Sequence, residues 1–328
     1  MKMILHAAVV FALALLVCGC EKKQASTPQG TKNTVNQLYI EVSALGNLPY
    51  FYDHKMGMKF AGQALGVRTE YVGPPKLDLN QMAADFEQAI ARKPNGIVVV
   101  GFSPQLNPLV DKAVDAGIPV VTVDADLPGT KRVAFVGTGN FQAGYQGGKK
   151  LASLINGKGQ VAIMTKPGQS NLEERVAGYK KALSESPDIE LVQVTDTKSD
   201  AIIAAQAASA LMQKYPQLAG IGCVEAAGGK GAATAAREAN RAGKVKIVAM
   251  DRDNDVLELI KEGAISASIA QQTYLMPLYA VQILYNLNNN PPPISSDNAK
   301  AGISGTPAVI DTGVIIVDKT NCEYFIRR

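Results

Sequence analysis

Carboxylate and amide side chains recur along this chain directly after short apolar segments of the strand type. The members of this set are Asp124 and Asp126 after residues 118–123, Glu225 after 218–222, Asp251 after 245–250 and Gln271 after 267–270. Carboxylates and amides form paired hydrogen bonds, which suit a ligand that carries many hydroxyl groups. A single residue of this kind is more often a helix cap or a turn residue, so the prediction of a ligand site rests on the whole set.

Aromatic and smaller polar residues follow strand-like segments in the first half of the chain. Tyr50 and Phe51 come soon after the first predicted strand, and aromatic rings suit the apolar face of a sugar. Asn47 precedes them, and Ser103 follows a later strand. We therefore expect these four residues to line the same site as the carboxylates.

The residue types that metal sites and nucleophilic catalysis need are scarce. The chain has two histidines, of which only His54 lies in the predicted folded region, and we expect it on a helix surface. One histidine argues against a zinc site and against a histidine-based triad. The segment 228–231 (GGKG) lacks the spacing of a phosphate-binding P-loop. We therefore predict no cofactor and no metal, and a chain that is not an enzyme.

Strand-like and helix-like segments alternate from Gln37 onward. Continuous β-branched runs such as 96–100 and 118–123 are typical of strands buried on both faces of a parallel sheet, whereas 52–65 and 201–214 have helical apolar spacing. The alternation predicts an α/β architecture, and the length of 328 residues favours two sheets over one. Ligands of open α/β sheets bind beyond the carboxyl ends of the strands, where the polar set lies.

The first residues have the features of an export signal. A positive residue precedes an apolar segment (4–17) that is too short to span a bilayer. Gly19 before Cys20 resembles the lipobox of bacterial lipoproteins, with an ordinary signal peptide as the alternative. We therefore predict a signal peptide (1–19), a polar tether (20–36) lipid-anchored at Cys20, and a location in the periplasm or at the outer face of the cell membrane.

Charge and cysteine content add two further expectations. The formal net charge of +4 argues against a nucleic-acid partner. Beyond the anchor the chain has Cys223 and Cys322, which either pair in an oxidising compartment or stay separate thiols.

From Gln37 to about Val317 the sequence resembles the ribose/galactose type of periplasmic binding protein. The resemblance is carried by 47–51 (NLPYF), 94–97 (PNGI), 116–124 (AGIPVVTVD), 248–251 (VAMD) and 269–272 (IAQQ), of which 116–124 is the most specific. It implies two doubly wound parallel-sheet lobes of the type I fold, joined by a three-strand hinge. The implied N-terminal lobe spans 37–138 and 273–310, and the C-terminal lobe spans 139–272 and 311–328, with hinges near 138–139, 271–273 and 311–313.

The resemblance also implies site residues and a partner. Thr138, Glu173 and Arg175 join the predicted ligand-binding residues, because Glu173 matches the position of an arginine in the family and Arg175 is close by. Lobe closure on the ligand and delivery to the membrane permease of an ABC importer are the implied function. We expect a monomer whose membrane contact is through the lipid anchor.

Some positions depart from the family pattern. Ala125 stands where an arginine is frequent, and Glu225 stands where an asparagine is usual. With the other acids of the set these residues predict a cleft that has little balancing positive charge, in which like charges repel. We therefore expect an amino sugar or a polyol rather than an acidic sugar. The Asp124-Ala125-Asp126 arrangement also resembles receptors for the furanone signal autoinducer-2, which stays open as a ligand.

Three other functions are considered beside transport. The first alternative is a sensor that presents a sugar or autoinducer-2 to a chemoreceptor or sensor kinase. A LacI-like repressor core shares the fold, but the export signal and the lack of a helix-turn-helix before Gln37 argue against it. An enzyme that uses paired carboxylates as acid and base is the least favoured.

Overall fold

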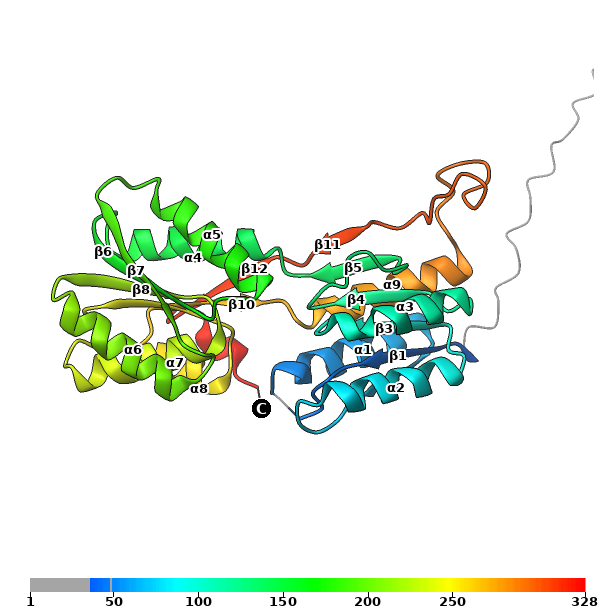
Figure 1. The fold of residues 1–328 in the computed structure, drawn as a ribbon, viewed down its shortest axis with the longest axis horizontal. Coiled ribbons are helices and arrows are strands. Elements are labelled where there is room, and N and C mark those ends of the chain that lie inside the picture. Colours follow the sequence, from blue (N-terminus) through cyan, green and yellow to red (C-terminus); the bar gives the residue numbers. More distant parts are fainter. Residues whose placement is uncertain (1–35, 48, 328) are drawn as a thin grey trace, which may run out of the picture. The chain divides into compact units, whose positions relative to one another are not determined.

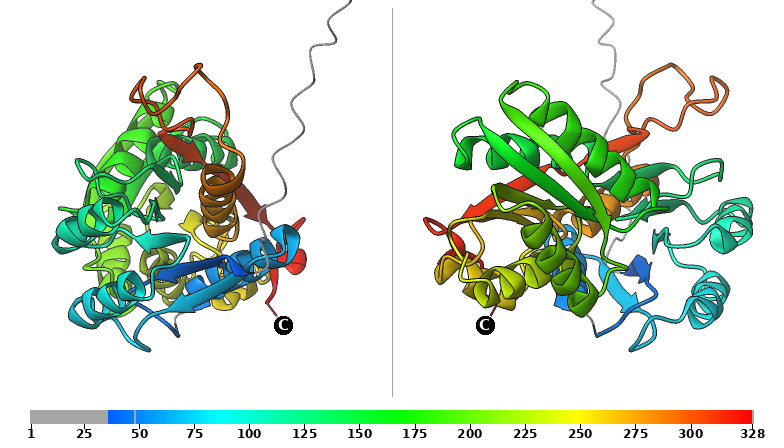
Figure 2. Two further views of the ribbon diagram at one scale, coloured as in Figure 1. Left: turned by 90° about the vertical axis from the view of Figure 1, so that its right-hand side faces the viewer. Right: turned by 60° about the vertical axis from the view of Figure 1, so that its left-hand side comes forward.

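The computed structural model describes residues 36–47 and 49–327 (Figure 1). The predicted signal peptide and Cys20 lie outside these residues. In the described part of the chain the strands form two six-stranded sheets, and helices flank both of them (Figure 2). The prediction of two doubly wound, mainly parallel sheets is therefore confirmed.

The first sheet is the centre of the N-terminal lobe, and its strand order is β11-β5-β4-β3-β1-β2. Its strands are β1 (Leu38–Val42), β2 (Arg68–Val72), β3 (Gly96–Val100), β4 (Val120–Val123), β5 (Ala134–Gly137) and β11 (Val309–Asp311). All of its strand pairs are parallel. Every residue of β3 and β4 is buried, as expected for β-branched runs that have helices on both faces.

The second sheet is the centre of the C-terminal lobe, with the order β12-β10-β9-β8-β6-β7. Its strands are β6 (Gly159–Thr165), β7 (Ile189–Asp196), β8 (Leu218–Cys223), β9 (Lys246–Met250), β10 (Ala267–Gln271) and β12 (Val314–Asp318). Only the edge strand β12 runs antiparallel to its neighbour, β10. The two sheets have equivalent strand orders, in which β4 and β9 are each the third strand.

Helices cover these sheets in the order that the alternation predicts. The N-terminal lobe has α1 (Tyr52–Leu65), α2 (Leu79–Ala91), α3 (Asn107–Asp115) and α9 (Leu275–Asn289), and the C-terminal lobe has α4 (Asn140–Leu154), α5 (Ser170–Leu183), α6 (Ala201–Lys214), α7 (Ala226–Glu238) and α8 (Asn254–Lys261). Short 3-10 turns are η2 (Pro49–Phe51), η3 (Pro104–Leu106) and η4 (Cys322–Phe325). Asp78 and Asp200 cap the first turns of α2 and α6, and α1 ends at Gly66, whose φ of +65° suits glycine.

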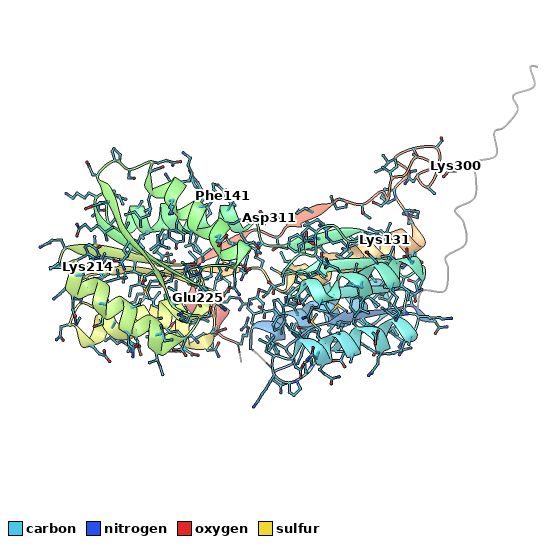
Figure 3. The ribbon with its side chains drawn as sticks, viewed as in Figure 1. Lys131, Phe141, Lys214, Glu225, Lys300 and Asp311 are labelled. Atoms are coloured by element: carbon cyan, nitrogen blue, oxygen red, sulfur yellow. The ribbon has the colours of Figure 1, made fainter. Side chains whose placement is uncertain are left out.

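The chain passes between the lobes at three places, between β5 and α4, between β10 and α9, and between β11 and β12. Two of these segments are joined by the Thr312 amide, which donates to the Gly137 carbonyl over 2.8 Å. Asp311, labelled in Figure 3, accepts from the amides of Gly139 at 2.7 Å and Gly313 at 2.8 Å. The crossing segments are therefore linked by a backbone hydrogen bond and by the Asp311 carboxylate.

Two further points concern the residues that the structure describes. Cys223 and Cys322 are both buried and both free thiols, so they do not pair. Among the described helices, none is long and apolar enough to cross a membrane.

Candidate ligand-binding site

Asp124 and Asp251 occupy matching positions in the two lobes. Asp124 follows β4 and Asp251 follows β9, and both have left-handed backbones, with φ of +64° and +67°. Their amides donate to the carbonyls of Val136 at 3.2 Å and Ile269 at 2.9 Å. Among residues other than glycine, aspartate and asparagine adopt this conformation most readily, so it suits the residue type at both positions.

On the N-terminal lobe an aromatic group adjoins Asp124. The Tyr50 hydroxyl donates to Asp124 Oδ1 over 2.7 Å. Burial raises the pKa of Tyr50 well above its usual value, and the charges of Asp124 and Asp251 raise it further, whereas Arg175 lowers it. Phe51 is buried next to Tyr50. Its ring is edge-on to that of Tyr50 at 5.1 Å and to that of Phe102 at 6.0 Å between centroids. Tyr50 therefore stays protonated and can donate a hydrogen bond.

On the C-terminal lobe a chain of hydrogen bonds leads from Arg175 to Asp251. Arg175, on α5, is only 5 % exposed and donates to Asn140 Oδ1 at 2.9 Å and to the Val224 carbonyl at 3.0 Å. It also donates to Gln271 Oε1 at 3.1 Å, and Gln271 Nε2 in turn donates to Asp251 Oδ1 at 3.0 Å. Arg175 is thus fixed by three partners within its own lobe.

Glycines on α4 and α5 allow Arg175 to reach this position. A side chain on Gly144 would collide with the backbone carbonyl of Arg175, and one on Gly178 would collide with the carbonyl of Phe141. Because both positions lack a Cβ atom, the two helix backbones approach closely. This approach brings Asn140, at the start of α4, within hydrogen-bond distance of the arginine.

The carboxyl group of Asp251 connects the two halves electrostatically. Burial raises its pKa to about 6, while Arg175 and the hydrogen bond from Gln271 act in the opposite direction. The charge of Asp124 is one of the causes that raise it. The two aspartates are therefore close enough to interact, although they belong to different sheets.

Other predicted site residues have partners of their own. Asp126 accepts from the Thr122 hydroxyl at 2.7 Å and forms an ion pair with Arg132, 2.5 Å from Nε to Oδ1. Glu225, labelled in Figure 3, caps α7 by accepting from the Ala227 amide, and it also accepts from Thr197. Both carboxylates are thus satisfied within their own lobes.

The structure does not bring Glu173 together with Arg175. Glu173 is exposed at the start of α5 and accepts from the Gly168 amide at 3.1 Å. Two of the acids have positive partners, because Arg132 pairs with Asp126 and Arg175 acts on Asp251, whereas Glu173 lies apart. The preference for an amino sugar or a polyol stays a prediction.

Three smaller predicted residues lie in different surroundings. Asn47 is exposed, and Ser103 is 8 % exposed and accepts from the Gln105 amide. Thr138 is 4 % exposed, and its hydroxyl has no partner among the described residues. Whether they contact a ligand stays a prediction.

The buried pair of His54 and Glu41 was not predicted from the sequence. His54 is fully buried rather than on a helix surface, and its Nδ1 lies 2.5 Å from Glu41 Oε1. A glutamate inside the apolar run Leu38–Val42 was the available signal, because a buried charge requires a partner.

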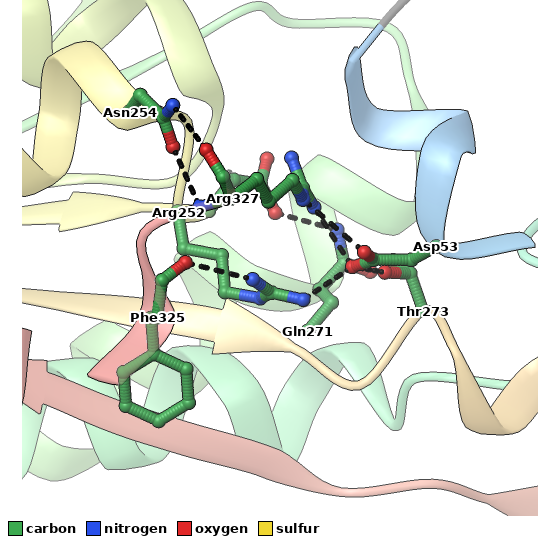
Figure 4. A network of polar contacts seen from close by, with 8 residues as sticks. Asp53, Arg252, Asn254, Gln271, Thr273, Phe325 and Arg327 are labelled. Carbon is green, nitrogen blue, oxygen red and sulfur yellow. Dashed lines mark hydrogen bonds and ion pairs between the residues drawn. The ribbon is translucent and has the colours of Figure 1, made fainter. Parts of the chain in front are cut away.

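A second polar cluster joins the lobes beside this site (Figure 4). Asp53, on α1, accepts from Arg252, from the Thr273 hydroxyl at 2.8 Å, and from Arg327 Nη2 at 2.7 Å. Arg252 immediately follows Asp251, and Arg327 is held by reciprocal hydrogen bonds with Asn254. Two arginines of the C-terminal lobe thus share one buried carboxylate of the N-terminal lobe.

Comparison with known proteins places this geometry in a family. A family model described as the periplasmic binding protein domain matches residues 42–291. The chain belongs to this family. The matched range includes most of both lobes and the residues from Tyr50 to Gln271 that form the site.

The periplasmic binding proteins most useful for comparison are sugar binders. The D-allose-binding periplasmic protein of Escherichia coli (strain K12) is 27 % identical over 243 residues, which cover 71 % of this chain and 78 % of the relative. The ribose import binding protein RbsB of Bacillus subtilis (strain 168) is 25 % identical over 290 residues, covering 86 % and 92 %. The structure of AraP, an arabinose-binding protein from Geobacillus stearothermophilus, superposes with a TM-score of 0.84 at 35 % identity and covers 89 % of this chain and 100 % of AraP.

Proposed function

We propose that this chain captures a small sugar or polyol outside the cytoplasm by closing its lobes around it, and delivers it to an ABC importer. The observation that carries the proposal is the pair Asp124 and Asp251, which follow the matching strands β4 and β9 of the two lobes and accept hydrogen bonds from Tyr50 and Gln271. Two carboxylates on opposite sides of a ligand accept hydrogen bonds from hydroxyls at its two ends. The relatives support this, because their names include D-allose, ribose and arabinose.

The donors and aromatic rings of the site favour a neutral aldose or polyol. Arg175 supplies fixed N–H donors, Asp124 and Asp251 supply acceptors, and Tyr50 and Phe102 supply ring faces. Because the chain belongs to a family of binding proteins, we propose binding without catalysis.

A thermal-shift and calorimetric screen tests this function. The panel contains D-ribose, D-allose, L-arabinose, D-galactose and xylitol. One of them should raise the melting temperature, since a ligand at 100 times its Kd stabilises the folded state by about 2.7 kcal/mol. The Asp124→Asn/Asp251→Asn double variant is the control and should show no shift. If no sugar or polyol stabilises the wild-type chain, the proposed ligand class is wrong.

We further propose that the protein is a monomeric lipoprotein anchored through Cys20. The apolar segment 4–17 and the residue pair Gly19-Cys20 support this. Replacing Cys20 by serine should release the protein from membranes and abolish incorporation of a labelled fatty acid. Replacing Cys18 by serine should change neither, and retention of the Cys20→Ser variant would contradict the anchor.

A further inference from the structure

A buried ion pair lies beneath the aromatic part of the site. Glu41, in β1, and His54, in the first turn of α1, are both fully buried. His54 Nδ1 and Glu41 Oε1 are 2.5 Å apart, and the remaining nitrogen of His54 has no partner among the described residues. Such a pair is costly to bury and therefore needs a reason.

The carboxylates around this histidine favour its protonated form. Burial alone would lower the pKa of His54, but the charge and the hydrogen bond of Glu41 raise it. The charges of Asp124 and Asp53 act in the same direction, so the net pKa lies above the usual value.

The position of His54 connects it to the ligand site. Its ring centroid lies 6.0 Å from that of Tyr50, whose hydroxyl binds Asp124, and 5.0 Å from that of Phe51. Among the ion pairs of the described residues, none involves Asp124, and the next residue is Ala125. In the other lobe burial raises the pKa of Asp251, and the charge of Arg175 acts in the opposite direction.

We propose that His54, held by Glu41, is the cation that balances Asp124 in the N-terminal lobe, as Arg175 balances Asp251 in the C-terminal lobe. His54 is thus a positioning residue that touches no ligand atom. It limits the repulsion between Asp124 and Asp251 when the lobes bring them together around a ligand. Its effect on sugar affinity rests on the function proposed above, whereas its pairing with Asp124 does not.

The pH dependence of the pairing follows from the groups around His54. These are Glu41 on β1, Asp53 on α1 itself, Tyr50 in η2 and Asp124 after β4. Tyr71 on β2 interacts with Glu41 and Asp124 rather than with His54 itself. The tyrosines stay neutral near neutral pH, since burial raises the pKa of both. His54 loses its proton as the pH rises through its raised pKa, and sugar affinity should decrease over the same interval.

The first test needs no sugar. In the full-length chain carrying His6→Gln, His54 is the only histidine, so its imidazole NMR signals are assigned without ambiguity. Asp124→Asn should lower the pH midpoint of His54. Asp126→Asn is the matched control, because Asp126 is neutralised by Arg132, and it should leave the midpoint unchanged. An identical midpoint in the Asp124→Asn variant and the parent overturns the proposal.

The second test adds the best sugar of the panel. Sugar affinity should fall about tenfold across the His54 titration, and by linkage sugar saturation should raise the His54 midpoint by about one pH unit. Glu41→Gln, which keeps a hydrogen-bond acceptor, should lower the midpoint and move the affinity change with it. A flat affinity across the midpoint overturns the role in binding. If no sugar binds, the proposed function fails, and the Asp124→Asn comparison still decides the pairing.

Discussion

Asp124 and Asp251 directly follow β4 and β9, which are each third in the strand order of their sheet, and the charge of Asp124 adds to the burial that raises the pKa of Asp251. The two carboxylates come from different lobes and repel one another. A ligand that places hydroxyl groups between them replaces this repulsion by hydrogen bonds.

Replacing either aspartate by asparagine should weaken sugar binding. Asparagine tolerates the left-handed backbone, so the fold should be retained. A hydrogen bond to a charged group contributes about 1.5–3 kcal/mol, so we expect affinity to fall about 10- to 100-fold by calorimetry. Asp126→Asn is the control and should bind with nearly wild-type affinity, because Asp126 is paired with Arg132. Equal losses in all three variants would contradict the site.

Sugar affinity should also fall on the acid side, for a different reason. Asp251 has a pKa raised to about 6, so it takes up a proton as the pH falls below that value and ceases to accept hydrogen bonds with both oxygens. A sugar that donates to the carboxylate favours its ionised form. Calorimetry between pH 4.5 and 7 should show this loss in the wild type and not in Asp251→Asn.

The unliganded Asp251→Asn variant should be more stable than the wild type at pH 7. The pKa of Asp251 is higher in the folded protein than in the unfolded chain. Its contribution to the free energy of unfolding is therefore fully present below its usual pKa and is lost as the pH rises through about 6. Asparagine avoids this loss, and we expect a gain of about 1–2 kcal/mol in the free energy of unfolding at pH 7. Denaturant titrations at pH 4 and pH 7 check it, and an equal difference at both values would be inconsistent with the burial of a charge.

A side chain at Gly144 should disturb Arg175. Gly144→Ala places a methyl group against the Arg175 carbonyl, which forces α4 and α5 apart. Overpacking of this kind costs about 1–3 kcal/mol, and sugar affinity should fall as well, because Asn140 no longer holds the arginine. Glu174→Ala, on the exposed side of α5, is the control for both measurements. Wild-type affinity in Gly144→Ala would show that Arg175 does not depend on the helix contact.

Removing the charge of Asp53 should weaken the connection between the lobes. Asp53→Asn leaves Arg252 and Arg327 without their shared carboxylate, and we expect a loss of about 1–3 kcal/mol in the free energy of unfolding. The matched change Asp255→Asn removes an exposed ion pair with Lys230 and should cost less than about 0.5 kcal/mol. Differential scanning calorimetry compares the two, and equal melting curves would mean that the Asp53 pairs contribute no stability.

The fold followed from sequence because its signals are local. The β-branched run of β3 and the glycine after α1 each fix an element without knowledge of distant residues. The site depends on pairings that are distant in sequence. Asp126 and Arg132 are six residues apart, but Glu41 with His54 and Arg175 with Gln271 require the packed sheet and helices to be known.

Helix register explains why the structure separates Glu173 from Arg175, both of which the resemblance named as ligand-binding residues. Residues two apart on an α-helix point in nearly opposite directions, so only one of them can face the core of the lobe. The structure buries Arg175 and exposes Glu173.

The burial of Cys223 and Cys322 allows this protein to be labelled at one engineered cysteine and used as a fluorescent reporter of sugar binding. Both thiols are nearly inaccessible, and burial raises the pKa of Cys223, so neither should react readily with maleimide dyes. Phe141, which is 46 % exposed at the start of α4 and close to a crossing segment, offers a place for an engineered cysteine. In a variant that also lacks Cys18 and Cys20, a fluorophore attached there would convert sugar capture into a change of emission.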